Sequence, residues 1–188
     1  MDQATFFGVT EKQVENFCRY LGHVETPYIR VVGGEPLMHP NFVDVISRMQ
    51  ETFVNKKFLI ATNGILLTDD LVNIPNTEYM ITLYPQNKHI AQQFKGKITI
   101  TERSYYDRNH DPDLSEERAK RAHKKCGYRQ LRMIGDNLYD CCHAETLERI
   151  GRSPLVHVKI AENCDAELLA RDDLWQECKH CFVGDVFG

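Results

Sequence analysis

Six of the seven cysteines in this chain of 188 residues fall in its last third. Cys178 and Cys181 form a C-x2-C pair, a spacing that lets two thiolates bind one metal ion or one cluster. Cys126 precedes a segment that we expect to form a β-hairpin with its turn at residues 135–137, and Cys141 stands at the far end of that segment. Because a hairpin returns the chain to its start, Cys126 and Cys141 can face each other. The four cysteines therefore predict a four-thiolate site.

The cysteine pattern leaves two alternatives open. The first is a set of thiols that pack in the core and bind no metal. The second concerns the metal, because four thiolates bind zinc and iron–sulfur clusters equally well. Cys18 stands alone inside a predicted helix and is interpreted as a core residue, while Cys164 is a spare ligand or a packed thiol. In a reducing compartment, an odd number of cysteines indicates metal ligands or core thiols rather than disulfides.

A second group of candidate residues lies in turns that follow predicted strands. Gly33, Gly34 and Glu35 follow the first strand, and paired glycines let a backbone approach a ligand closely. The plainer interpretation is a tight turn between a strand and a helix. The next two predicted strands end in the turns at residues 61–64 and 82–85. If the three strands are parallel, all three turns line one edge of a sheet.

The elements that must position these residues alternate along the first hundred residues. Predicted helices cover residues 10–21, 41–53, 68–73 and 86–94, and predicted strands cover residues 28–32, 57–61, 78–83 and 97–101. This alternation is typical of an α/β fold with a parallel sheet built from βα units. Ligands of such sheets bind outside the carboxyl ends of the strands, so we expect the functional edge there.

The composition of the chain changes near residue 102. Residues 102–113 are polar and loop-like, and residues 114–124 are expected to form a charged helix. Short strands, turns and cysteines follow. We therefore expect two domains, residues 1–113 and residues 114–188.

Composition and charge exclude several classes of protein. Apolar residues make up 42% of the chain and charged residues 27%, as in soluble globular proteins. A net charge of −4 provides no field that recruits nucleic acid or an anionic membrane. No apolar stretch is long enough for a membrane span, and no basic region followed by an apolar core marks a secretory signal. We expect a cytoplasmic protein without nucleic-acid or membrane partners.

The turn G-G-E-P-L-x-H-P at residues 33–40, followed by a helix and a strand that ends in T-N-G at residues 62–64, resembles the second and third βα units of the radical S-adenosylmethionine (SAM) enzymes. The resemblance covers residues 10–101 and implies a partial (βα) barrel. It also implies that the first turn holds the amino group of SAM and that the second turn lies beside the SAM site. The cofactor-binding residues that it implies are Gly33, Gly34, Glu35, Pro36, Thr62 and Asn63.

The chain departs from this family in one motif. In the family, a C-x3-C-x2-C loop binds a 4Fe–4S cluster whose open iron chelates SAM. That motif is absent from these 188 residues. The resemblance therefore implies the fold and the turn without the reductive cluster, and we expect SAM to bind weakly or not at all.

The last third of the chain resembles the SPASM and shorter twitch extensions of radical SAM enzymes, which bind auxiliary 4Fe–4S clusters. The shared pattern is a cysteine, a hairpin with a glycine turn, L-Y-x-C-C and a later C-x2-C. Six cysteines fit a one-cluster twitch better than a two-cluster SPASM domain, and the resemblance favours iron–sulfur over zinc. The ligands that it implies are Cys126, Cys141 with Cys142 as its alternate, Cys178 and Cys181.

Three functions are consistent with these features. The first is a radical SAM-like iron–sulfur protein, a shortened member whose full-length form performs SAM-dependent radical chemistry on a peptide or small-molecule substrate. The second is a non-catalytic iron–sulfur subunit that transfers electrons or serves a partner protein that supplies the missing part. The third is a zinc-stabilised α/β binding domain. Catalytic residues stay unassigned in all three.

Overall fold

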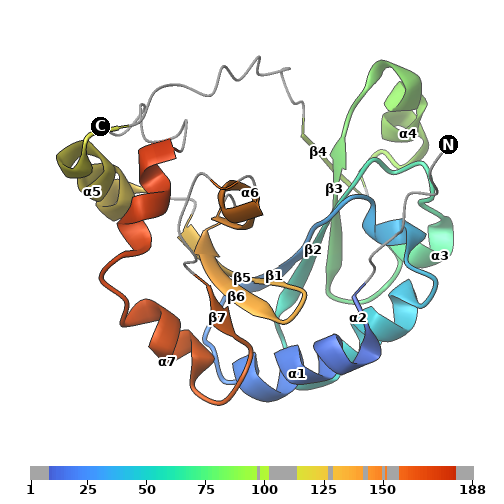
Figure 1. Ribbon diagram of the computed structural model, residues 1–188. Helices are drawn as coiled ribbons and strands as arrows, with labels where there is room; N and C mark the ends of the chain where they lie inside the picture. The colour runs from blue at the N-terminus through green and yellow to red at the C-terminus, as the bar shows by residue number, and fades with distance from the viewer. Residues whose placement is uncertain are drawn as a thin grey trace, which may run out of the picture. The chain divides into compact units, whose positions relative to one another are not determined.

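A computed structural model gives the structure of the chain (Figure 1). It describes residues 9–96, 98–101, 114–126, 129–141, 144–149, 151 and 157–180. The chain divides into two compact units, the first made of Met1–Val14 and Gly22–Tyr106 and the second of Glu15–Leu21 and Asp107–Gly188. The predicted domain boundary at residues 113 and 114 falls at the end of a segment, residues 102–113, that lies outside the described residues.

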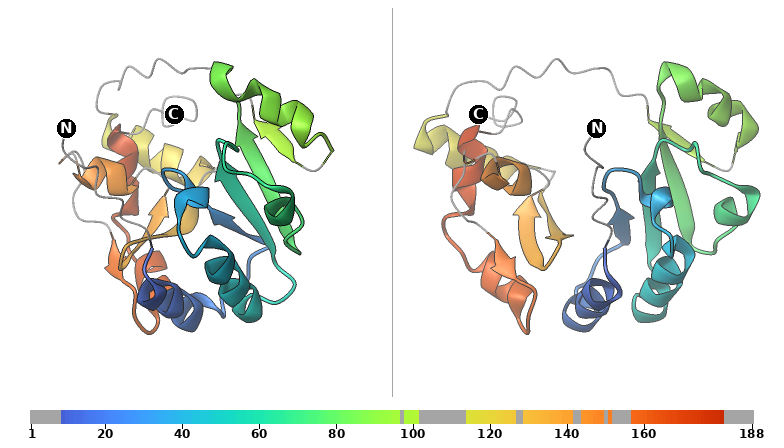
Figure 2. Two further views of the ribbon diagram at one scale, coloured as in Figure 1. Left: turned by 90° about the vertical axis from the view of Figure 1, so that its right-hand side faces the viewer. Right: turned by 45° about the vertical axis from the view of Figure 1, so that its right-hand side comes forward.

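The first unit is built on a parallel sheet of four strands, which confirms the predicted α/β class. The strands are β1 (Tyr28–Val31), β2 (Lys57–Thr62), β3 (Thr77–Thr82) and β4 (Thr99–Thr101). The helical segments between them are η1 (Pro36–Met38), α2 (Phe42–Thr52), α3 (Asp69–Val72), η2 (Pro85–Asn87) and α4 (Lys88–Gln93). The strands lie side by side in chain order, and right-handed crossovers then place the connecting helices on one face. Figures 1 and 2 show α2, α3 and α4 on the same side of the sheet.

Side-chain caps set where two helices begin. The helix α1 (Glu11–Leu21) starts with a capping box, in which the Thr10 N–H donates to Gln13 Oε1 at 2.9 Å and the Gln13 N–H donates to Thr10 Oγ1 at 3.2 Å. The helix α3 also starts with a side-chain cap, since Thr68 Oγ1 accepts from the Leu71 N–H at 3.3 Å. Short sequence motifs therefore determine both helix starts.

Alternate residues of the strands form the core of the first unit. The buried side chains on this face of the sheet are Ile29, Phe58, Ile60, Tyr79 and Ile81. The helices reach the same face: the Tyr79 hydroxyl donates to the Leu71 carbonyl of α3 at 2.8 Å, and burial raises the pKa of Tyr79 to about 12. Gln50 of α2 donates to Thr77 Oγ1 at 3.2 Å. Each large apolar side chain buried here stabilises the unit by roughly 1.5–3 kcal/mol.

The second unit is built on an antiparallel sheet with the strand order β5-β6-β7. The strands are β5 (Arg129–Ile134), β6 (Asn137–Cys141) and β7 (Val158–Lys159), and the helical segments are α5 (Glu116–Lys125), α6 (Ala144–Arg149), α7 (Cys164–Leu169) and η3 (Leu174–His180). The predicted hairpin forms between β5 and β6, although Asn137, predicted in the turn, already belongs to β6. The predicted charged helix forms α5, where Ser115 Oγ accepts from the Arg118 N–H at 3.4 Å.

Two acidic side chains are buried in the second unit together with its apolar residues. Asp140 is 3% exposed and Glu177 is 2% exposed. Acidic residues are almost never fully buried unless they are paired, so these two positions need a physical explanation. None of the helices in the described part of the chain is long and apolar enough to cross a membrane.

Candidate functional site

Glu35 joins the turn after β1 to the turn after β2. Its Oε2 accepts from the Asn63 N–H at 2.8 Å. Its Oε1 accepts from Thr62 Oγ1 at 2.5 Å and from the Leu37 N–H at 3.2 Å. Hydrogen bonds to a charged group each contribute about 1.5–3 kcal/mol. Three residues that the sequence predicts at this edge, Glu35, Thr62 and Asn63, are therefore brought together by direct contacts.

Asn87 makes the next connection, from the turn after β2 to the end of β3. This side chain is fully buried, and its Nδ2 donates to the Asn63 carbonyl at 2.6 Å and to the Thr82 carbonyl at 2.9 Å. Its Oδ1 accepts from the Tyr84 N–H at 2.6 Å. Asn87 is not among the residues predicted from the sequence, where its only signal is its position two residues after Pro85. Glu35 and Asn87 together link the carboxyl ends of three neighbouring strands.

The glycines in these turns serve different purposes. Gly64 has a φ of +75°, and a Cβ there would lie 2.9 Å from Ile90 Cγ2, so the fold itself requires glycine. Gly33 and Gly34 do not have positive φ, and a Cβ at either position would meet nothing within 4 Å. Neither conformation nor packing against the described residues explains these two glycines. Their backbone is exposed and open to close approach by a ligand.

Pro36 and His39 lie in the first turn and help to fix its backbone conformation. Pro36 occupies the first position of η1, where its missing N–H leaves no hydrogen bond unmade. His39 Nδ1 accepts from the Asn41 N–H at 3.2 Å, so its Nε2 carries the proton and donates to the Val9 carbonyl at 2.9 Å. Both ring nitrogens of His39 are thus used inside the fold.

The structure describes three of the five predicted metal ligands. Cys126 directly follows α5, Cys141 ends β6 and Cys178 lies in η3, and all three side chains are half-buried. Cys142 and Cys181 lie outside the described residues. A four-thiolate site of the predicted kind would therefore include at least one cysteine beyond the described part of the chain.

The elements that carry these cysteines are close together. The hairpin pairs Arg129, which lies just after Cys126, with Cys141 on the opposite strand. The segment η3 packs along α5, and the Leu114 N–H just before α5 donates to the Lys179 carbonyl at 2.8 Å. Within the residues that the structure describes, no three Cys, His, Asp or Glu side chains are arranged so that they could hold a metal ion.

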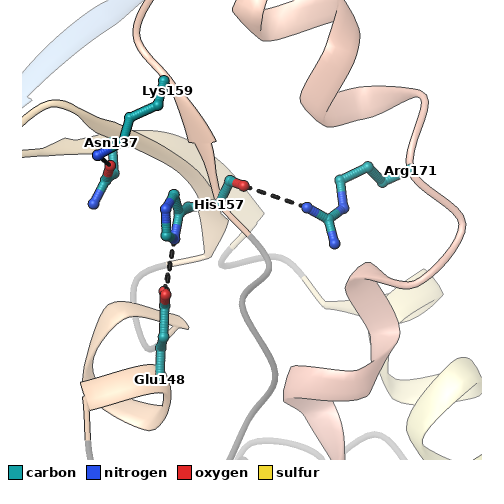
Figure 3. A network of polar contacts seen from close by, with 5 residues as sticks. All are labelled: Asn137, Glu148, His157, Lys159 and Arg171. Carbon is teal, nitrogen blue, oxygen red and sulfur yellow. Dashed lines mark hydrogen bonds and ion pairs between the residues drawn. The ribbon is translucent and has the colours of Figure 1, made fainter.

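Two histidine–carboxylate pairs lie in the second unit. His123 Nε2 lies 3.4 Å from Asp140 Oδ2, and His157 Nδ1 lies 2.8 Å from Glu148 Oε1. Figure 3 shows Glu148 extending from α6 toward His157, and Arg171 directed at the His157 carbonyl, to which it donates at 3.3 Å. Asp140 and Glu148 therefore each have a partner that can carry positive charge.

Glu177 lies in η3 and is 2% exposed. Its Oε1 is buried and has no hydrogen-bond partner among the described residues. Burial is the largest of the causes that raise the pKa of Glu177 to about 9. Negative charge on Cys141 is the second cause, ahead of Asp140 and Glu148, while the Arg171 guanidinium opposes them. The carboxyl of η3 and the thiol that ends β6 therefore lie within electrostatic reach of each other.

Sequence reasoning missed Glu177, although a signal was present. Glu177 directly precedes the C-x2-C pair in the sequence E-C-K-H-C. An acid beside a cysteine is ordinarily solvated, however, and nothing in this short sequence indicates that its carboxyl is buried.

No protein-family model matches the sequence of this chain, and no curated protein matches it. Function is therefore inferred from two groups of residues. The first is the set of joined turns at the carboxyl edge of the parallel sheet, and the second is the set of cysteine-bearing elements of the second unit.

Proposed function

We propose that this chain is a radical SAM-like iron–sulfur protein, with a partial (βα) barrel in its first unit and an auxiliary cluster in its second. The observation that carries the proposal is the Glu35 carboxylate, which joins the G-G-E-P turn to the T-N-G turn at the carboxyl edge of the sheet. Strands in chain order with helices on one face are the arrangement from which (βα) barrels are built. Motif, position and topology thus favour the same family.

The first turn offers a ligand both polar and apolar contacts. Backbone groups are exposed at Gly33 and Gly34. Glu35 Oε2 accepts one hydrogen bond from the described residues, which leaves it an acceptor position for an amino group. Met38 and Ile65, which follow the two turns, are 50% and 57% exposed. A site with a few polar groups beside apolar surface suits a ligand such as SAM, which has an amino-acid part and an aromatic part.

The affinity of the chain alone for SAM should be low. The C-x3-C-x2-C motif that supplies the chelating iron in the family is absent from these residues. Without it, SAM would be held mainly by hydrogen bonds that each contribute about 1 kcal/mol. Radical chemistry on a peptide or small-molecule substrate would need a reductive cluster from outside these 188 residues.

The second unit is proposed to bind the auxiliary cluster. Its ligands would be Cys126, Cys141, Cys178 and Cys181, with Cys142 as the alternate for Cys141. The buried Oε1 of Glu177, which lacks a hydrogen-bond partner among the described residues, supports a cationic group in this region. A 4Fe–4S cluster, when bound, supplies one-electron transfer.

A second candidate function is a non-catalytic iron–sulfur subunit that transfers electrons or serves a partner protein. The missing C-x3-C-x2-C motif favours this candidate, because it removes the cluster that would cleave SAM. The two candidates share the auxiliary cluster and differ in SAM chemistry. If the reduced chain forms 5′-deoxyadenosine from SAM, the first candidate is favoured. If the chain has an intact cluster but forms no 5′-deoxyadenosine, the second candidate is favoured.

The test of the proposed function is anaerobic reconstitution of the whole chain with iron and sulfide. We expect a brown protein with broad absorption near roughly 400 nm from thiolate-to-iron charge transfer. One zinc ion per chain and no uptake of iron would contradict the proposal and favour a zinc-stabilised binding domain. Calorimetry with SAM is the second measurement. Tight binding to the chain alone would show that another loop replaces the missing chelating iron.

A further inference from the structure

The outer face of α5 carries a group of exposed cations. Ala119 and Ala122 are buried on the inner face of this helix. The exposed cations follow one another at helical spacing on the other face, and they are Lys120, Arg121, Lys124 and Lys125. Among the described residues, Lys120 is paired with Glu116 at 2.5 Å, one turn earlier. The last two turns of α5 therefore present positive charge in a chain whose net charge is −4.

An aromatic side chain lies beside these cations. The segment η3 packs along α5, and it carries Trp175, which is half-buried. Lys120 Nζ lies 4.7 Å and Lys179 Nζ lies 5.0 Å from the centroid of the Trp175 ring, so both ammonium groups make cation–π contacts. We call the four cations of α5, together with Trp175 and Lys179, the basic surface. It combines positive charge with part of a large apolar ring.

The segment around α7 has the complementary character. Leu169, at the end of α7, is 56% exposed. Three exposed acids, Glu162, Glu167 and Asp172, lie within seven residues of it along the chain. The other side of α7 packs on β6 and β7. We call Leu169 and the three acids the acidic surface. An apolar side chain with charged neighbours is typical of a protein–protein contact, which has an apolar centre and a polar rim.

The basic and acidic surfaces lie apart within one copy of the second unit. Figures 1 and 2 show α5 and α7 at opposite ends of this unit, and η3 leads from the end of α7 toward α5. The helix α5 packs against η3, whereas α7 packs against the sheet. The opposite charges of the two surfaces can therefore come into contact only between two molecules.

We propose that the acidic surface of one copy of this chain binds the basic surface of a second copy, with Leu169 against Trp175. A two-fold dimer makes this contact twice, because each copy offers both surfaces. A nucleic acid fits the basic surface less well, since two lysines lie over the ring on which a base would stack. The inference needs neither SAM nor an iron–sulfur cluster. It therefore goes beyond the proposed function, and either can fail while the other stands.

Sedimentation equilibrium of the whole chain tests the contact directly. The samples contain a thiol reductant, which prevents disulfides between copies. We expect a monomer–dimer equilibrium at roughly 0.05 M salt and a shift toward monomer at roughly 0.5 M salt, because salt screens exposed charges. A chain that stays monomeric at low salt overturns the proposal. It does so even if the chain binds heparin, since the basic surface would then serve a polyanion.

Charge reversal tests whether these two surfaces form the contact. The basic-face variant carries Arg121→Glu and Lys124→Glu, and the acidic-face variant carries Glu162→Lys and Glu167→Lys. We expect each variant alone to associate about tenfold more weakly than the unmodified chain or less, because like charges then face each other. Leu169→Ser removes the apolar centre and should also weaken association. Circular dichroism checks that each variant folds.

A control variant has the same change in net charge elsewhere. Lys88→Glu with Lys95→Glu reverses two exposed lysines of the first unit and should associate more strongly than the basic-face variant. If the control and the basic-face variant are weakened equally, net charge rather than the basic surface explains the loss, and the proposal fails.

Mixing the two charge-reversal variants gives the decisive result. In an equimolar mixture, the reversed α5 of one variant is acidic and the reversed α7 of the other is basic, so both contacts of a mixed dimer again join opposite charges. We expect the mixture to associate although neither variant does so alone. A mixture that stays monomeric would show that these surfaces do not bind each other, and it would overturn the proposal.

Discussion

The two units bury polar residues of different kinds. In the first unit the buried polar side chains include Thr62 and Asn87, which are neutral and hydrogen-bonded within the fold. In the second unit they include Asp140 and Glu177, which are acids. A neutral group needs only hydrogen bonds when it is buried, whereas an acid needs a proton, a cation or a metal. The buried polar groups of the first unit are therefore satisfied within the fold, whereas the buried acids of the second unit need a proton or a positive partner.

The largest effect should follow from removing a thiolate of the second unit. We expect Cys178→Ala to lose the bound iron completely and to expose residues 126–180 to protease, while residues 22–96 of the first unit stay protected. The reason is that metal binding adds directly to folding, by about 10–16 kcal/mol in small zinc-dependent domains. Limited proteolysis with iron quantitation measures both effects.

A matched control for this variant is Cys18→Ala, which changes a half-buried cysteine in α1 that is not a predicted ligand. Its iron content should equal that of the unmodified protein. The ligand assignment would be contradicted if Cys178→Ala kept its full iron content or if Cys18→Ala lost iron. The expected difference in metal dependence between the two units would then have no support.

A smaller but clear effect is expected from Asn87→Ala in the first unit. The substitution leaves the Asn63 and Thr82 carbonyls and the Tyr84 N–H without their partner, at a loss of about 1–3 kcal/mol for each buried group left unsatisfied. Hydrogen exchange of peptides from β2 and β3 should accelerate accordingly. Gln93→Ala, at an exposed position of α4, is the control and should leave exchange unchanged.

Substitutions at two glycines compare a structural turn with a binding turn. Gly64→Ala should destabilise the first unit by about 1–3 kcal/mol, because its φ is positive and Ile90 occupies the space of a Cβ. Gly33→Ala should change stability by less than about 0.5 kcal/mol but weaken whatever SAM binding the protein shows. Thermal melts and calorimetry measure the two effects. Equal destabilisation by both substitutions would mean that Gly33 is also structural.

The smallest predicted effect concerns the ion pair at the end of α7. The hydrogen bond from Arg171 is the largest cause that lowers the pKa of Asp173; burial opposes it, and the charge of Arg171 adds to the lowering. The pair therefore stabilises the protein above the ordinary aspartate pKa, and this contribution is lost as the pH falls through the lowered pKa. Both side chains are partly exposed, so the contribution should stay below about 1 kcal/mol.

The measurement for this pair is the pH dependence of the melting temperature. Asp173→Asn should melt below the unmodified protein at neutral pH, and the difference should shrink on acidification and in high salt. Asp172→Asn, at the exposed neighbouring position, should match the unmodified protein throughout. If the difference in melting temperature between Asp173→Asn and the unmodified protein grew on acidification, the ion pair would not stabilise the protein in the predicted pH range.

Local signals explain why much of the fold is predictable from the sequence. The capping residues Thr10 and Thr68 act on hydrogen bonds three residues away, so their motifs identify helix starts without tertiary information. The apolar runs of β1, β2 and β3 and the helices between them likewise predict a parallel sheet. The turns at its carboxyl edge follow from that topology alone, which is why Glu35 and Asn63 could be placed at one edge.

The residues that were not predicted from the sequence are buried because of contacts with residues that are far away in the sequence. Asn87 is buried because it reaches Asn63, and the two belong to turns after different strands. Glu177 is buried within electrostatic reach of Cys141, which ends a strand more than thirty residues earlier. No periodicity marks a polar residue for burial, since burial is set by the partners that the fold brings to it.

The position of Asn63 between Glu35 and Asn87 has a consequence for any ligand at this edge. Its N–H is bound by the first residue and its carbonyl by the second, while its own Oδ1 accepts from the Ile65 N–H at 2.8 Å. Three turns are thus held in one conformation before a ligand arrives. Binding there orders little additional backbone, so the loss of backbone conformational entropy on binding is small.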